Sequence, residues 1–295
     1  MSFVAKDWLS AARLRTLPLA LSSIIMGGFL AEKANKFSIP VFLLACLTTI
    51  LLQILSNFAN DYGDTQNGAD LADRVGPSRA VQSGKITPDQ MLGGIKIVGA
   101  ASLLSGLALI YIAFGGFASS LFWIFLGIGL LSILAAYTYT AGKKPYGYAG
   151  LGDISVFIFF GIVGVAGSYF LYTQSLSPDI FLLGTTCGAL ATGVLNINNL
   201  RDINSDKTAG KITIPVRLGR KKTVIYHWFI LGLAIASTLA YIAISSDTKS
   251  YYLLSFVLII LNGFQVSKSE NPDPYLKTLA LTSLAHVLLL GLSII

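Results

Sequence analysis

The sequence is poor in charged residues, cysteine and histidine, and each shortage excludes a class of protein. Charged residues make up 12% of the 295 residues, about half of the roughly 25% that is typical of a soluble domain. Cys46 and Cys187 lie far apart in apolar runs, which predicts two buried thiols rather than a disulfide framework or a cysteine metal site. His227 and His286 are equally isolated, so a metal site made of histidines is excluded.

Several familiar catalytic motifs are also missing. The sequence contains no Walker A string, no glycine-rich nucleotide fingerprint and no serine–histidine–aspartate or cysteine–histidine combination. ATP-driven transport and acyl-transfer chemistry therefore lose support. The net charge of +7 does not indicate nucleic-acid binding, because basic residues that flank membrane spans are expected cytoplasmic anchors.

Hydrophobic residues are abundant instead, at 54% of the chain with a mean hydropathy of +0.70. Because ~20 apolar residues cross a bilayer, the sequence predicts nine spans, near 14–31, 38–60, 92–114, 117–141, 151–173, 178–200, 223–245, 250–267 and 276–294. We expect the first to be an anchor rather than a removed leader, since no clear cleavage site follows it. The predicted fold class is an all-α polytopic membrane protein with a single domain, residues 1–295.

The distribution of lysine and arginine predicts the orientation of these spans. With the N-terminus in the cytoplasm, 18 of the 21 basic residues lie on the cytoplasmic side, and only Lys33, Lys36 and Lys249 lie outside. This asymmetry follows the positive-inside rule. It places the C-terminus outside and the two long loops, 61–91 and 201–222, at the cytoplasmic face, where we expect any chemistry.

Two stretches at cytoplasmic span ends are rich in carboxylates and carboxamides. They contain Asn57, Asn60, Asp61 and Asp64, and then Asn199, Asp202 and Asp206. Spacings of three or four residues put each set on one helix face. Ionisable groups beside hydrocarbon indicate a functional site, although solvated helix ends are the alternative. Such oxygen ligands suit Mg²⁺, which completes its shell with substrate phosphates, so the stretches predict a site for Mg²⁺ and a diphosphate.

Basic residues near these stretches are candidates for binding the diphosphate. The candidates are Arg15, Arg79, Lys143 and Lys211. Arginine holds phosphate oxygens in pairs, and lysine acts as a point charge. The alternative for each is a positive-inside anchor, and this alternative is weakest for Arg79, because glycine and proline shape the chain around it.

With these residues in place, the sequence resembles the UbiA superfamily of intramembrane prenyltransferases, which carry two Asp-rich motifs. The resemblance rests on residues 12–18 (ARLRTLP), 60–64 (NDYGD), 74–79 (RVGPSR), 147–153 (GYAGLGD) and 198–206 (NNLRDINSD). These strings are most similar to the branch whose acceptor is 1,4-dihydroxy-2-naphthoate. One departure is that Gly68 stands where other branches have a third carboxylate, and Asp70 follows two residues later.

The resemblance implies nine helices around a central cavity that opens to lipid, in the cell inner membrane. It also implies Mg²⁺ held by Asp61, Asp64, Asp202 and Asp206, to which we add Asn57 and Asn60 as oxygen ligands. The implied reaction moves a polyprenyl group from polyprenyl diphosphate to 1,4-dihydroxy-2-naphthoate, with loss of CO₂, and gives demethylmenaquinol for menaquinone biosynthesis. An apolar cavity would keep the carbocation from water.

Further residues are candidates for contacts with the acceptor or the prenyl chain. They are Tyr62, Tyr139, Tyr146 and Asn199. Aromatic faces stabilise a cation, although an interfacial aromatic belt is the alternative for the tyrosines. Asp153 either orients or deprotonates the acceptor, or it caps the following helix. Gly161, Gly164 and Gly167 are expected to permit close helix packing, with room for an isoprenoid tail as the alternative for the last two.

Other functions stay open at this point. The acceptor could instead be 4-hydroxybenzoate, homogentisate, or a chlorin or haem ring. A CDP-alcohol phosphotransferase is a poor match, because its acids form one contiguous motif, whereas Asp61 and Asp202 lie far apart in this chain. A cation-coupled transporter would carry its carboxylates near the bilayer midplane on broken helices, rather than at the ends of spans.

Overall fold

The structure, a computed structural model, describes residues 3–68, 79–245 and 249–295, so Asp70 and Arg74 lie outside the described residues. The described residues form helices only. Their bounds are α1 Phe3–Ala12, η1 Leu14–Thr16, α2 Leu17–Lys33, α3 Ile39–Gln66, α4 Pro88–Phe114, α5 Ser120–Thr138, η2 Tyr146–Ala149, α6 Gly152–Val156, η3 Phe157–Gly167, α7 Ser168–Thr173, α8 Ile180–Arg201, α9 Ile203–Thr208, α10 Ile214–Ile244, α11 Tyr252–Lys268 and α12 Asp273–Ile294. The segment η3 is a π-helix.

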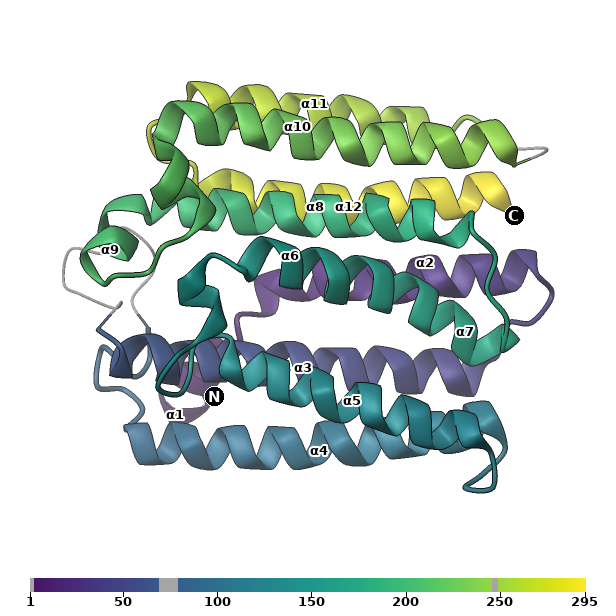
Figure 1. Ribbon diagram of the computed structural model, residues 1–295, viewed down its shortest axis with the longest axis horizontal. Coiled ribbons are helices and arrows are strands. Elements are labelled where there is room, and N and C mark those ends of the chain that lie inside the picture. Colours follow the sequence, from purple (N-terminus) through teal and green to yellow (C-terminus); the bar gives the residue numbers. More distant parts are fainter. Residues whose placement is uncertain (1–2, 69–78, 246–248) are drawn as a thin grey trace.

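The long helices run side by side, and the chain passes back and forth between the two ends of the bundle (Figure 1). Most of α8 is buried, because it packs against α10, η3 and α12. By contrast, α5 is apolar but buries only Phe122 among its side chains. An apolar helix with such exposure is suited to contact lipid rather than water.

Among the described residues, eight helical segments are long and apolar enough to cross a membrane. The first runs over Ala5–Lys33, so it begins earlier than the predicted span 14–31. The predicted span 250–267 corresponds to α11, which is apolar but shorter, with 17 residues. It packs against α10 and α12 in the same bundle (Figure 1). The protein is therefore an all-helical polytopic membrane protein.

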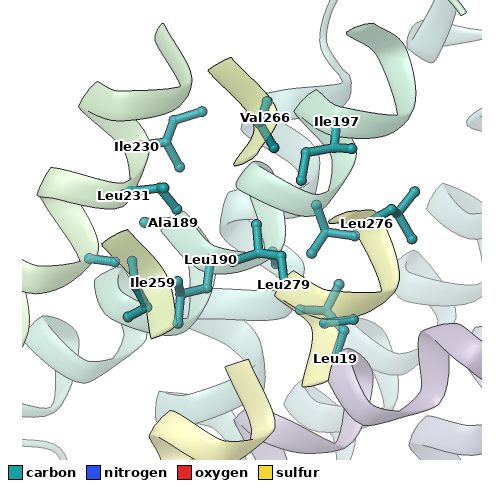
Figure 2. Close-up of a cluster of buried hydrophobic side chains, with 14 of the residues drawn as sticks. Leu19, Ala189, Leu190, Ile197, Ile230, Leu231, Ile259, Val266, Leu276 and Leu279 are labelled. Carbon is teal, nitrogen blue, oxygen red and sulfur yellow. The ribbon is translucent and has the colours of Figure 1, made fainter. Parts of the chain in front are cut away.

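The C-terminal helices share one apolar core with α8. Figure 2 shows Leu190 of α8 among side chains from α10, α11 and α12, including Ile230, Ile259 and Leu279. Leu19 of α2 joins the same cluster. Because lipid tails are as apolar as these side chains, close van der Waals packing rather than escape from water holds such helices together. This packing fixes the position of α8 and its polar end.

Two glycines of η3 allow a close approach between helices. A Cβ atom on Gly161 would lie 2.4 Å from the carbonyl oxygen of Gly184 and 2.6 Å from Cα of Gly188, both in α8. A Cβ atom on Gly164 would lie 2.7 Å from Cβ of Ser23 in α2. No side chain fits at such distances, so the predicted packing role is confirmed for Gly161 and Gly164.

Candidate active site

The two acidic stretches meet at one end of the bundle. Helices α3 and α8 both end there, at the left of Figure 1, and α9 follows α8. The ammonium of Lys211 lies 3.9 Å from Oδ1 of Asp64 and 3.6 Å from Oδ1 of Asp206. All three side chains are at most 9% exposed. One buried cation is thus shared by a carboxylate from each stretch, which is the convergence that the sequence predicts.

Arg79 reaches the same region from the segment before α4. Its guanidinium forms an ion pair with Oδ2 of Asp64 at 2.5 Å and donates to the main-chain carbonyl oxygen of Asn60 at 2.5 Å. The Arg79 side chain is buried. Two of the four basic residues proposed for the diphosphate, Arg79 and Lys211, therefore lie on either side of Asp64.

Asp61 lies three residues before Asp64 but has different partners. The main-chain N–H groups of Ala80 and Val81 donate to its two carboxylate oxygens, at 3.0 and 3.2 Å. The side chain is only 1% exposed. Asp61 therefore holds the turn that begins at Arg79, and this turn delivers the guanidinium to Asp64.

Tyr148 of η2 completes the surroundings of Asp64. Its hydroxyl donates to Oδ1 of Asp64 at 2.8 Å, and the Lys211 ammonium lies 5.5 Å from the centre of its ring. Burial, and then the charge of Asp64, raise the pKa of Tyr148, so the phenol keeps its proton. The main-chain N–H of Ile212 donates to the Tyr148 carbonyl oxygen at 2.9 Å, which ties η2 to the Lys211 segment.

Asp202 stands at the junction between α8 and α9 and pairs with Arg201. The guanidinium donates to both oxygens of Asp202, at 2.8 and 2.6 Å, and also pairs with Asp273 at the start of α12. The predicted single helical face is interrupted here, because α8 ends at Arg201 and α9 begins at Ile203. Asp206 consequently belongs to a separate short helix.

A cavity of about 410 Å³ runs between α2, α3, α4, α5 and η3. The charged residues described above do not line it, but Asn60, whose carbonyl oxygen accepts from Arg79, does. Polar residues line one end, namely Arg13, Asn60, Tyr139, Tyr146 and Asn198. The other end is lined by Ile24, Ala45, Leu109, Ile110 and Leu171. The shape offers a polar end for a charged head and an apolar channel for a long hydrocarbon tail.

Tyr139 and Tyr146 form part of the cavity wall, as the predicted contact role requires. Their rings meet edge to face, with 5.3 Å between centroids, and the Tyr146 hydroxyl donates to the carbonyl oxygen of Ala135 at 3.0 Å. Gly63 allows the segment after Tyr139 to approach α3, because a Cβ atom there would lie 2.5 Å from the main chain of Thr140. The glycine inside the acidic motif thus has a packing role that its sequence position alone did not reveal.

Two predicted residues have other contacts in the structure. The carboxamide of Asn57 donates to the carbonyl oxygen of Ala12 at 2.8 Å, so it fastens the N-terminal segment to α3. Tyr62 packs against the cluster that contains Ala11 and Leu55 and is not among the residues that line the cavity. The structure therefore does not bring Tyr62 into the cavity wall with Tyr139 and Tyr146.

The other predicted residues lie at the edge of the site. Lys143 is exposed in the turn after α5 and forms no ion pair with a described carboxylate. Arg15 is one-third exposed and lies 4.0 Å from Asp273. Asn199 is buried beside the cavity-lining Asn198, at 3.5 Å between the two carboxamides.

Asp153 accepts a hydrogen bond from the hydroxyl of Tyr226, at 3.1 Å, and is 6% exposed. Helix α6 begins at Gly152, and its N-cap position is Leu151, with no side-chain cap. The capping alternative for Asp153 is therefore wrong. The carboxylate is a buried acceptor paired with a phenol of α10.

Sequence reasoning missed two partners of the site. Asp273 pairs with Arg201 across 72 residues, and only the helix-start pair Asp273-Pro274 hinted at its position. Arg13 is not among the predicted site residues, yet it lines the cavity and adopts a left-handed backbone with φ of 48°. A non-glycine residue in this region is uncommon and often marks a functional position.

Within the described part of the chain, no three histidine, cysteine or acidic side chains are close enough to form a ready-made metal site. Mg²⁺ needs only one or two carboxylates when substrate phosphates complete its shell. Asp64 and Asp206 face the same cation, the Lys211 ammonium. The oxygen donors and their placement therefore fit a divalent cation that arrives with a phosphate-bearing substrate.

The fold and the site together define a membrane-embedded helical protein with a buried cluster of charged residues and an apolar cavity. The chain belongs to the UbiA prenyltransferase family, whose model matches residues 20–286. It is similar to the 1,4-dihydroxy-2-naphthoate octaprenyltransferase of Haemophilus influenzae, with 46% identity over 96% of this chain and 93% of the relative. The enzyme of the same description from Escherichia coli is also 46% identical, over 90% and 86% of the two chains.

Solved structures share the fold at lower identity. A UbiA homologue from Aeropyrum pernix K1 matches with a TM-score of 0.67 and 18% identity, over 96% of this chain and 98% of that chain. A homologue from Archaeoglobus fulgidus bound to DMAPP and Mg²⁺ matches with a TM-score of 0.63 and 15% identity, over 95% and 98%. These likenesses support the helical arrangement in Figure 1.

Proposed function

We propose that this protein transfers an octaprenyl group from octaprenyl diphosphate to 1,4-dihydroxy-2-naphthoate, with loss of CO₂, in menaquinone biosynthesis. Two relatives that carry this activity in their names are 46% identical over most of both chains. The observation that carries the proposal is the shared contact of Asp64 and Asp206 with Lys211. Arg79 connects this cluster to Asn60 in the wall of an apolar cavity. This arrangement suits a substrate with a diphosphate head and a hydrocarbon tail.

Arg79 and Lys211 are the residues proposed to hold the diphosphate. Both are buried and reach Asp64 from different segments. Asp64, Asp202 and Asp206 would hold Mg²⁺, with Asn60 beside them. Bound Mg²⁺ would supply positive charge that stabilises the leaving diphosphate. Asp61 acts indirectly, because it fixes the turn that positions Arg79.

The reaction then follows from the charges and the cavity. The allylic C–O bond breaks, its electron pair leaves with the diphosphate, and Arg79 and Lys211 stabilise the negative charge that develops. Apolar walls and the faces of Tyr139 and Tyr146 surround the allylic carbocation and exclude water. The electron-rich ring forms the new carbon–carbon bond, and the ring carboxylate leaves as CO₂.

The test uses purified protein in liposomes with octaprenyl diphosphate and 1,4-dihydroxy-2-naphthoate, and mass spectrometry detects the product. We expect turnover that disappears with EDTA and returns with Mg²⁺. Asp206→Asn should lower the rate by about a hundredfold, the scale seen when a group that stabilises transition-state charge is removed. Asp89→Asn, at an exposed position of α4, is the matched control.

Three outcomes would contradict the proposal. A preference for 4-hydroxybenzoate in a competition between the acceptors would show that the acceptor is wrong. Wild-type turnover by Asp206→Asn would remove the role of the second acidic stretch. Ion flux through the liposomes in the absence of any prenyl diphosphate would favour a cation-coupled transporter instead.

We further propose nine spans, with α11 as the eighth in order, a cytoplasmic N-terminus and a C-terminus outside. The acidic stretches lie at the end of the bundle that carries the exposed basic residues Lys143, Lys221 and Lys222, as the positive-inside rule requires. In a background without cysteine, Lys143→Cys should react with an impermeant maleimide only from the cytoplasmic side. Lys36→Cys should react only from outside, and the opposite pattern would reverse the orientation.

A further inference from the structure

The wall of the cavity contains an unusual helical segment. The π-helix η3 and the start of α7 contribute Phe159, Phe160, Val163, Gly164, Gly167 and Ser168 to the lining. The segment is fixed against α2, because the Ser23 hydroxyl donates to the carbonyl oxygen of Phe160. π-helical turns are rare and are frequent at functional sites, and here the π-helix faces the space proposed for the prenyl tail.

The glycines of this segment differ in what surrounds them. Gly161 and Gly164 are closed in by neighbouring helices, as described above. The nearest atom to a Cβ on Gly167 would be Cγ1 of Val163, at 3.8 Å, an ordinary contact distance. Because Gly167 also lines the cavity, a side chain at this position would enter the cavity without displacing the protein.

Gly167 lies well away from the charged end. Ser155, whose hydroxyl lies 3.0 Å from that of Tyr146, precedes it by 12 positions on the same continuous helical stretch. At the α-helical rise, 12 positions correspond to about 18 Å along the stretch. Leu171, one turn further on, is buried in the apolar cluster with Ile24 and Leu109, so Gly167 borders the distal part of the cavity.

We infer that Gly167 is a specificity-determining position: its missing side chain leaves the space that the far end of a long prenyl chain occupies. This inference rests on the proposed function, because it assumes a prenyl diphosphate donor. A larger residue at 167 should exclude long donors and leave short ones unaffected, since a short tail ends before it reaches this position.

The test compares farnesyl and octaprenyl diphosphate as donors for wild type, Gly167→Ala and Gly167→Leu. For Gly167→Leu we expect kcat/KM with octaprenyl diphosphate to fall roughly tenfold or more, the scale of steric discrimination in an apolar pocket. The value with farnesyl diphosphate should stay within about twofold of wild type, and Gly167→Ala should fall between the two. Gly232→Leu is the matched control, at an exposed helical glycine with no atom within 4 Å of its Cβ.

An equal loss with both donors, or no loss with either, would overturn the inference. The thermal shift that each diphosphate produces in purified protein separates this result from a failure of the proposed function. If no acceptor is prenylated but octaprenyl diphosphate stabilises wild type and not Gly167→Leu, the acceptor is wrong and the role of Gly167 stands. If both proteins are stabilised equally by both diphosphates, the role of Gly167 is refuted.

Discussion

Replacing Lys211 by methionine tests whether this side chain occupies the place of a cation between the two acidic stretches. Methionine keeps an apolar stem but removes the charge that lies 3.9 Å from Asp64 and 3.6 Å from Asp206. Each attraction is worth about 4 kcal/mol at an effective dielectric constant near 20. Desolvation of the ammonium offsets several kcal/mol of this sum. We therefore expect Lys211→Met to lower the free energy of unfolding by about 3 kcal/mol without divalent cations.

Thermal unfolding of purified protein in detergent, with EDTA or with saturating Mg²⁺, measures the effect. Mg²⁺ supplies positive charge to the same carboxylates, so most of the stability lost in Lys211→Met should return when it is added. Lys222→Met replaces an exposed lysine and should change stability little in either condition. An equal loss for Lys211→Met with EDTA and with Mg²⁺ would refute the reasoning, because Asp64 and Asp206 would then not share a site that a metal can enter.

Three further substitutions separate the roles of neighbouring groups. Asp61→Asn should raise the KM for the prenyl diphosphate and leave the Mg²⁺ concentration for half-maximal activity unchanged; a shift in that concentration would make Asp61 a ligand. Arg201→Met removes the two hydrogen bonds that Asp202 accepts from Arg201 and should cost about 3–5 kcal/mol in thermal unfolding, whereas an effect as small as that of Lys222→Met would show that the pair is not stabilising. Tyr148→Phe should cost about 1.5 kcal/mol. The cost should be smaller in an Asp64→Asn background, because the hydrogen bond of 2.8 Å then has a neutral acceptor; equal costs in both backgrounds would contradict that account.

The general position of the site could be predicted from the sequence for two physical reasons. Hydropathy indicates where a helix leaves the bilayer, so it predicts that both acidic stretches lie at the ends of spans. The asymmetry of lysine and arginine then predicts that both ends lie on the same side of the membrane. The spacing within each stretch then marked one helix face. Together these two signals predict that the stretches converge, and the contacts of Asp64 and Asp206 with Lys211 agree with that prediction.

The partners of individual side chains could not be predicted, because they come from segments distant in the chain. Arg201 and Asp273 are joined only when α12 folds back beside α8. The same spacing predicted both Asn57 and Asp64 as site residues, yet the Asn57 carboxamide donates a hydrogen bond to the carbonyl oxygen of Ala12. Periodicity identifies a face of a helix, but it does not identify which neighbour covers that face at each turn.

The first acidic motif shows how small a rotation separates two functions. Residues three positions apart differ by about 60° around a helix axis, so Asp61 and Asp64 lie on nearly the same face of α3. That difference is enough for Asp61 to meet the main-chain N–H groups of Ala80 and Val81, while Asp64 meets Arg79, Tyr148 and Lys211. A carboxylate whose partners are main-chain groups fixes the shape of a loop. A carboxylate surrounded by cationic side chains can instead bind another cation. The two acids of one motif therefore have different roles. Asp61 fixes the position of Arg79, and Asp64 is the carboxylate that Arg79 and Lys211 both contact.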